Sequence, residues 1–237
     1  MRKLLFILSS FFVLTACSDK EQKELQDEAA PPLENIDEPK ENFENINNNG
    51  ENDHSENEPE ETEGDLKCYF KPADSSATFI GDGNEFASYT ERTKWLAENY
   101  VATIIDNGGA VVMKVYRVLD DKIILVMDEL VEGTPEDATY PDIGSLTGLP
   151  ALEIYLAGPI EVGTTFGNWT IVETNMTLAT PYQTFKNVLV IEETGERFTN
   201  KKFFVEDYGV IKTESIMSLE LSEEVIVTST LENLSLH

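Results

Sequence analysis

Short apolar runs separated by turn residues dominate the chain from Phe79 onward. Valine, isoleucine and aromatic residues alternate there with polar ones, a pattern typical of half-buried β-strands. Asn107–Gly109 separates "NYVATIID" from "AVVMKVYRVL" and predicts a tight hairpin, because Asn and Gly tolerate positive φ. Asp120 and Asp121 divide that second run from "KIILVMDEL" and predict another hairpin. Since no segment has the period of a long amphipathic helix, these patterns predict a sheet of hairpins.

The strand after the first hairpin is apolar on both faces. Alternation places two apolar sets on opposite faces. One face carries Val111, Met113 and Val115, and the other carries Val112, Tyr116 and Val118. A strand of this kind has to be covered on both faces. Either another layer of chain packs against it, or one face lines an apolar cavity.

Strand patterns continue to the end of the chain. We expect a Gly-Pro corner at Pro159, a turn at Pro181 before a strand whose Phe185, Leu189 and Ile191 share a face, and a hairpin turning at Asp207–Gly209. A short helical turn fits within "TPEDATYPDIGSLTGLP". Residues 67–237 are therefore predicted to form one all-β, or β-dominated α+β, domain: an antiparallel curved sheet or half-barrel of about ten strands.

The first residues have the layout of an export signal. Arg2 and Lys3 precede the apolar run from Leu4 to Leu14, and small residues follow. A helix that crosses a bilayer needs roughly 20 apolar residues, so this run is too short for a permanent span. Residues 1–17 are predicted to be a signal peptide.

Leu14, Thr15, Ala16 and Cys17 resemble the lipobox of bacterial lipoproteins. The resemblance implies that the thiol of Cys17 receives a diacylglycerol, with fatty-acid chains such as palmitate, before the signal is removed. Two acyl chains hold a protein firmly on a membrane. The protein would then lie on the outer face of the cell membrane, attached through Cys17. The alternative is an ordinary secreted protein with a chance cysteine.

Charge divides the rest of the chain into two parts. Residues 18–66 hold 18 Asp and Glu against 3 Lys, which gives a net charge of −15 out of −28 for the whole chain. A segment so acidic and so poor in apolar residues is predicted to be a disordered linker. Its alternative interpretation is a low-affinity binder of calcium or basic partners. A nucleic-acid partner is not expected, because clusters of Lys and Arg are missing.

Cysteine and histidine limit the chemistry of the domain. If Cys17 carries lipid, Cys68 has no partner in its chain and is either a free thiol half-covered by the first strand or a link to a second molecule. The two histidines are His54, in the linker, and His237, the last residue. No nucleophile activated by a histidine base, no His-based zinc site and no cofactor are therefore expected within the domain.

Carboxylates remain as possible catalytic or metal-binding groups. Glu206 with Asp207, and Asp120 with Asp121, lie where turns are expected and are interpreted as solvated turn residues. Candidates for a hydrolase with two carboxylates lie near strands and include Glu85, Glu91, Glu98 and Glu153. "GDGNE", Gly81 to Glu85, offers oxygens for calcium but lacks the spacing of an EF-hand, so a glycine-rich turn is preferred.

Most of residues 69–232, including "ATFIGDGNEFASYTERTKW", resembles a family of uncharacterised lipoproteins of Gram-positive bacteria. The positions that match are Leu156, Pro159, Val162, Gly163, Trp169, Pro181, Thr184, Phe185, Phe203, Phe204, Gly209 and Lys212. Gln183 departs from a frequent glycine of that family. A weaker likeness to the half-barrel of lipoprotein carriers implies an acyl chain held against a concave sheet. These resemblances say little about function.

The expected function is a membrane-anchored extracytoplasmic binding or interaction module without catalysis. Its ligand could be a lipid, another apolar molecule or a partner in the cell envelope. The alternative is an exported hydrolase that uses two carboxylates on cell-wall glycan. The sequence does not indicate an oligomeric state.

Overall fold

The computed structural model describes residues 65–218 and 224–237. The chain separates into two units, Met1–Glu56 and Asn57–His237, and the described residues all belong to the second. The predicted export signal, Cys17 and the predicted linker up to residue 64 lie outside them.

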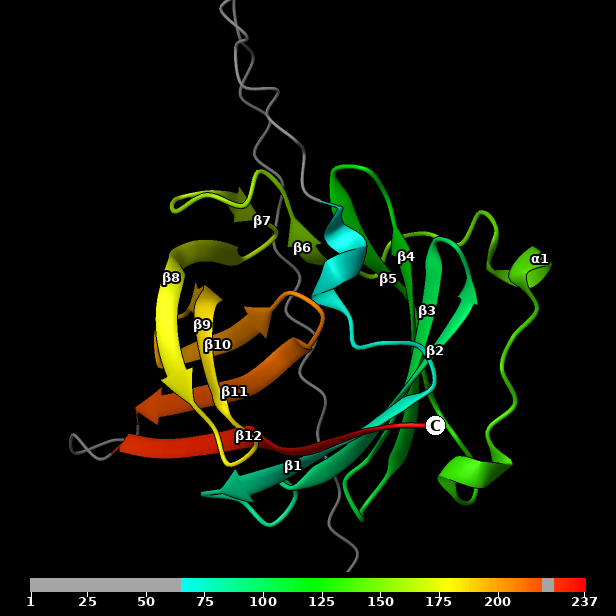
Figure 1. Cartoon of the computed structure of the whole chain (residues 1–237), viewed down its shortest axis with the longest axis horizontal. Helices are drawn as coiled ribbons and strands as arrows, with labels where there is room; N and C mark the ends of the chain where they lie inside the picture. Colours follow the sequence, from blue (N-terminus) through cyan, green and yellow to red (C-terminus); the bar gives the residue numbers. More distant parts are fainter. Residues whose placement is uncertain (1–64, 219–223) are drawn as a thin grey trace, which may run out of the picture. The chain divides into compact units, whose positions relative to one another are not determined.

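Twelve antiparallel strands form one sheet (Figure 1). They are β1 (Ser75–Asp82), β2 (Tyr89–Ala97), β3 (Tyr100–Asp106), β4 (Val111–Val118), β5 (Lys122–Leu130), β6 (Glu153–Ala157), β7 (Thr165–Phe166), β8 (Trp169–Ala179), β9 (Thr184–Thr194), β10 (Phe198–Val205), β11 (Gly209–Ser218) and β12 (Glu224–Leu236). The helical elements are short: η1 (Leu66–Tyr69), η2 (Pro135–Asp137) and α1 (Ile143–Leu146). The predicted all-β class is confirmed, with twelve strands in place of about ten.

The sheet nearly closes on itself and is open at one seam. Each strand pairs with its neighbours in sequence, and β12 returns to pair with β1, but β6 and β7 do not pair. The connector between them forms its own turns, in which Glu161 N–H donates to the Pro159 carbonyl at 2.8 Å and Thr164 N–H to the Glu161 carbonyl at 3.1 Å. The connector therefore ends one strand and starts the next without joining their edges.

The hairpin of β4 and β5 is covered on both faces by other parts of the chain. Val111, Met113 and Val115 pack with Leu146 of α1 and with the loop that carries it, while Tyr116 and Val118 pack with Leu66 and Phe70. Of the two expected alternatives, a covering layer of chain is found on each face of this hairpin. The predicted hairpin turns at Asn107–Gly109, at Asp120–Asp121 and at Asp207–Gly209 are present.

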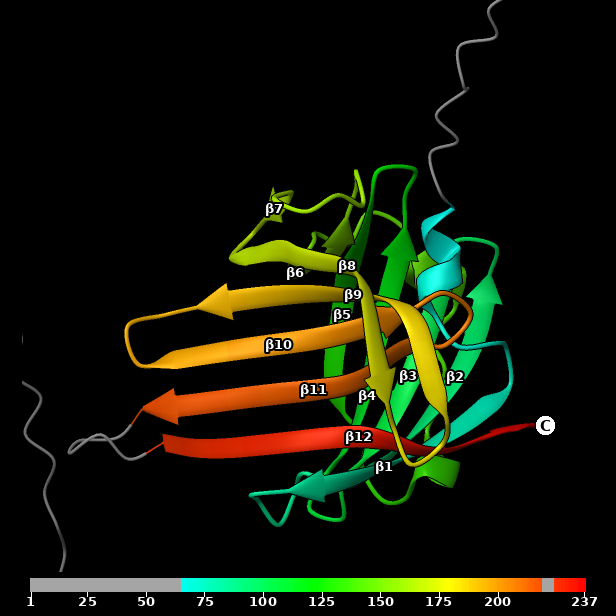
Figure 2. The same ribbon diagram turned by 60° about the vertical axis from the view of Figure 1, so that its left-hand side comes forward.

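The expected shared face of Phe185, Leu189 and Ile191 is wrong for Phe185. Leu189 and Ile191 belong to the cluster that contains Phe70, whereas Phe185 packs with Phe79 and Leu231. The register of β8 and β9 shifts three times, and Asn187 has a positive φ of 54°, so alternation is interrupted. The irregular hairpin crosses the sheet in front of β10–β12 (Figure 2).

A segment that we call the strap, Leu66–Lys71, lies inside the curve of the sheet (Figure 1). It starts where Asp65 caps η1 by accepting a hydrogen bond from Lys67 N–H at 3.0 Å. Leu66, Tyr69, Phe70 and Lys71 are all buried. In residues 65–218 and 224–237, no helix has the length and apolar character that a membrane crossing requires.

Candidate binding site

An open pocket of about 620 Å³ lies at the seam between β6 and the β7–β8 hairpin. We call it the seam pocket. One wall is the start of β6 with the residues before it, the opposite wall is the turn into β8, and β9 and β10 contribute one side chain each. Its lining is Ala151, Leu152, Glu153, Ile154, Gly167, Asn168, Trp169, Glu193 and Lys202.

Lys202 of β10 places the only cation of this lining next to two aromatic rings. Its ammonium nitrogen lies 4.4 Å from the ring centre of Trp169 and 5.2 Å from that of Tyr155. Glu153 Oε1 is 3.5 Å away, a loose contact. Burial lowers the pKa of Lys202 below its ordinary value and Lys114 acts in the same direction, while Glu153 and Glu193 oppose them.

Glu193 of β9 is held by side-chain amides. Asn168 Nδ2 and Asn200 Nδ2 each donate to one of its carboxylate oxygens at 3.2 Å. Ser215 Oγ in turn donates to Asn200 Oδ1 at 2.8 Å. Three strands and one turn thus fix the position of this carboxylate, and fixed polar groups of this kind are typical of binding pockets.

The strap closes the space behind the seam pocket. The ring of Phe70 stacks on Tyr155 of β6 at 5.7 Å, with further ring contacts to Tyr116 at 5.2 Å and Trp95 at 6.1 Å. Tyr155 also meets Phe204 edge to face at 5.4 Å. Burial raises the pKa of both Tyr116 and Tyr155 well above that of an exposed tyrosine. The concave side of the sheet near the seam is therefore filled by the protein's own aromatic side chains.

The glutamates that the sequence indicated are scattered. Glu85 is exposed in the turn between β1 and β2, Glu91 is paired with buried Lys71 at 2.8 Å, and Glu98 is paired with Lys67 at 3.3 Å. Glu153 alone among them lines the seam pocket, whose lining also includes Glu193. Sequence reasoning missed Glu193, Lys202 and Asn168 as site residues. Besides Glu153, the sequence singled out only Trp169 of this lining, through a family resemblance.

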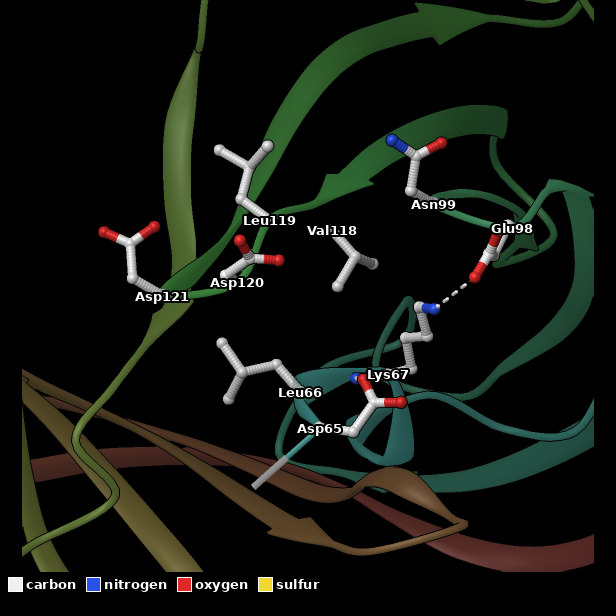
Figure 3. A pocket seen from close by; sticks show the side chains of 9 residues that line it. All are labelled: Asp65, Leu66, Lys67, Glu98, Asn99, Val118, Leu119, Asp120 and Asp121. Atoms are coloured by element: carbon white, nitrogen blue, oxygen red, sulfur yellow. Dashed lines mark hydrogen bonds and ion pairs between the residues drawn. The ribbon is translucent and has the colours of Figure 1, made fainter. Parts of the chain in front are cut away.

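A second open pocket, of about 880 Å³, lies where the strap begins (Figure 3). Leu66, Val118 and Leu119 lie near its centre, and Asp120 and Asp121 belong to the β4–β5 turn on one side. The other acidic groups of the lining are Asp65 and Glu98, and Lys67 is paired with Glu98. Asp121 is paired with Lys122 at 3.1 Å. This pocket holds a solvated acidic rim, as expected for turn residues.

Cys68 is a free, half-buried thiol in η1. Burial raises its pKa to about 12, and the nearby carboxylates of Glu206, Asp207 and Asp65 contribute. Asp207 N–H donates to the Cys68 carbonyl at 2.6 Å, so the turn after β10 rests against the strap. The expected half-covered thiol is found, although η1 holds it rather than a strand.

The glycine-rich segment "GDGNE" uses its side-chain oxygens for its own turn. Asp82 Oδ1 accepts from Gly83 N–H at 2.9 Å and Asn84 Oδ1 accepts from Phe86 N–H at 2.7 Å. Within the described part of the chain, no three His, Cys, Asp or Glu side chains are grouped to hold a metal ion. The hydrogen bonds of Asp82 and Asn84 are those of a turn. His237 N–H donates to the Asp74 carbonyl at 3.0 Å.

The sequence matches no protein-family model and no curated protein. Among solved structures, the chain is similar to a candidate exported protein with a YmcC-like fold from Bacteroides fragilis NCTC 9343, at 14% identity and a TM-score of 0.40, over 70% of this chain and 97% of that one. It is also similar to a candidate lipoprotein from Parabacteroides distasonis ATCC 8503, at 10% identity and a TM-score of 0.43, over 70% and 98%. Likenesses this distant say nothing about a site or an activity.

Proposed function

We propose that the chain is a membrane-anchored extracytoplasmic lipoprotein whose β-domain binds a ligand or partner at the seam pocket and carries out no catalysis. The observation that carries this proposal is the filled interior: Phe70 of the strap stacks on Tyr155 where a carrier would hold an acyl chain. The seam pocket, in contrast, opens to solvent and contains fixed polar groups next to an aromatic ring.

An apolar ligand inside the sheet is the less favoured version. Leu66 and Phe70 are 4% and 6% exposed, and both belong to the same cluster as Tyr116 and Val118. An acyl chain would have to expel these side chains from apolar surroundings, which costs about 1.5–3 kcal/mol for each large one. A ligand at the seam requires no such rearrangement.

Tryptophan fluorescence distinguishes the two positions, because the chain has two tryptophans. Trp95→Phe leaves Trp169 at the seam, and Trp169→Phe leaves Trp95 in the interior beside Phe70. We expect soluble cell-envelope fragments to change the emission of the Trp95→Phe chain and not that of the Trp169→Phe chain. A response of the Trp169→Phe chain to fatty-acid micelles would reject the seam and support an interior lipid.

The hydrolase alternative is retained because Glu153 and Glu193 line one pocket. Purified cell-wall glycan incubated with the protein tests it through the release of reducing ends. We expect no release above that of a heat-denatured sample. Release that disappears in both Glu153→Gln and Glu193→Gln, and persists in Glu192→Gln, would make the protein an enzyme.

The anchor is tested separately from the pocket. Replacing Cys17 by Ser should move the protein from the membrane fraction to the soluble exported fraction and remove acyl labelling, because the thiol that would carry the lipid is lost. Cys68→Ser is the matched control and should remain on the membrane. Acyl labelling that survives in Cys17→Ser would overturn the lipoprotein assignment.

A further inference from the structure

Within residues 65–218 and 224–237, no strand pairs with the edge of β6 that faces the seam. β6 ends the sheet and pairs with β5 alone, in the register that places Glu153 opposite Leu125 and Ala157 opposite Lys122. An unpaired edge presents backbone N–H and C=O groups to whatever lies beside it. A segment in extended conformation can add to such an edge as an extra strand.

The seam pocket lies directly beside this edge. Its lining includes Ala151–Ile154, so the pocket follows the first part of β6, and Gly167 and Asn168 face it from the β7–β8 turn. Leu152 is 59% exposed at the mouth. A strand paired with the start of β6 would therefore direct alternate side chains into the pocket.

The charges of the pocket favour a cationic side chain. Glu153 and Glu193 supply two carboxylates against the single ammonium group of Lys202. The Glu153 side chain is 46% exposed and makes only the loose 3.5 Å contact with Lys202, which itself packs on Trp169. Residues 67–237 also carry a net charge of −15, which attracts basic partners over longer distances.

We propose that an extended peptide segment of a basic partner protein adds to the β6 edge and places a lysine or arginine side chain in the seam pocket between Glu153 and Glu193. This inference rests on the proposed function and names the partner of the same pocket. Backbone pairing supplies affinity, and the two carboxylates select the basic side chain.

Synthetic peptides test this inference without a known partner. The probe is acetyl-Thr-Val-Lys-Val-Thr-amide, added to the full chain carrying Cys17→Ser while backbone amide resonances are recorded. We expect the resonances of Leu152, Ile154 and the Asn168 side chain to shift with a dissociation constant of about 1 mM or below, a weak but measurable affinity. The same peptide with Glu in place of Lys, and one with both valines replaced by Pro, should each bind at least about fivefold more weakly.

Variants at adjacent positions of β9 and of β10 provide matched controls. Glu193→Gln should weaken binding of the lysine peptide about fivefold, and Lys202→Met should strengthen it by a similar factor, because each changes the charge balance of the pocket. Glu192 and Lys201 form an ion pair with each other at 3.1 Å outside the pocket lining, so Glu192→Gln and Lys201→Met should change little. The resonance dispersion of each variant reports whether it is folded.

Other outcomes overturn the inference in distinct ways. Equal binding of the lysine and glutamate peptides rejects a basic partner, and shifts confined to other strands reject the β6 edge. Shifts of the β6 amides that depend on protein concentration without peptide indicate a second copy of the chain instead. If the peptides fail while cell-envelope fragments still change Trp169 emission, the seam function stands and only the peptide partner is wrong.

Discussion

The ammonium nitrogen of Lys202 lies 4.4 Å from the ring centre of Trp169, inside a pocket where two strand ends fail to meet. A lysine held over an aromatic ring is attracted to it, yet loses part of its hydration. The net effect here is a lowered pKa for Lys202, caused first by burial. Keeping Lys202 charged in this pocket therefore lowers the free energy of unfolding.

The lowered pKa of Lys202 makes the free energy of unfolding depend on pH, and the sign of this dependence is known. Because the pKa of Lys202 is lower in the folded than in the unfolded chain, the unfolded state binds more protons just below pH 10.5. The charged form destabilises the fold at neutral pH, and this destabilisation fades as pH rises through the folded pKa toward 10.5. Wild type should therefore gain stability relative to Lys202→Met between pH 8 and pH 10.5, measured by urea unfolding. A stability difference between wild type and Lys202→Met that stays constant over this range would contradict the assignment.

The strap should act as part of the core. Phe70→Ala removes a ring that is 6% exposed and touches three other rings, so we expect a loss of about 3–5 kcal/mol in the free energy of unfolding. Phe86→Ala, at a ring that is 50% exposed, should cost under about 1.5 kcal/mol. Similar losses for the two variants would show that the strap is only loosely held.

The ion pair of Lys71 and Glu91 predicts that removing the lysine alone destabilises the fold much more than replacing both residues. Lys71 Nζ contacts Glu91 Oε1 at 2.8 Å and donates to the Val210 carbonyl at 3.0 Å. Lys71→Met leaves the Glu91 carboxylate, whose side chain is only 15% exposed, without its cation and should cost about 3–5 kcal/mol, whereas adding Glu91→Leu should restore most of that loss. The exposed pair of Lys67 and Glu98 is the comparison, and Lys67→Met should cost under about 1 kcal/mol. A double variant no more stable than Lys71→Met would contradict this account.

Cys68 should react slowly with alkylating reagents. A pKa raised from 9.0 to about 12 lowers the thiolate fraction near pH 8 by a factor of about 1,000. In the Cys17→Ser chain, the rate of iodoacetamide modification should stay far below that of free cysteine and should increase with pH beyond pH 10. Asp207→Asn should raise the rate at pH 8, because it removes one of the charges that raise the pKa. A rate at pH 8 close to that of free cysteine would show that the thiol is exposed.

Local patterns predicted the hairpins because their cause is local. Asn107–Gly109 and the alternating strands around it determine one turn with little help from the rest of the molecule. The face of Phe185 could not be predicted in this way, because the positive φ of Asn187 and three register shifts interrupt alternation. The strap was missed as well, since nothing in "LKCYFK" shows that Phe70 meets Tyr155 of β6.

The candidate site depends even more on long-range contacts. Glu153, Asn168, Glu193 and Lys202 come from separate stretches of the sequence and meet because the sheet curves until β6 lies near β7. Listing strand-associated glutamates identified Glu153 and passed over Glu193. The alternation of "VLVIEE" indicates that its last two glutamates lie on opposite faces, and this signal could have distinguished Glu193 from Glu192.

Photocrosslinking in living cells tests the central claim, binding at the seam, most directly. A photoreactive amino acid replaces Leu152 at the mouth of the seam pocket, and in a second strain it replaces Leu130, which is 75% exposed and outside the pocket lining. The account predicts a discrete adduct from position 152 that decreases when Glu193→Gln is added and not when Glu192→Gln is added, and no matching adduct from position 130. No adduct from position 152, or the same adduct from both positions, would contradict it.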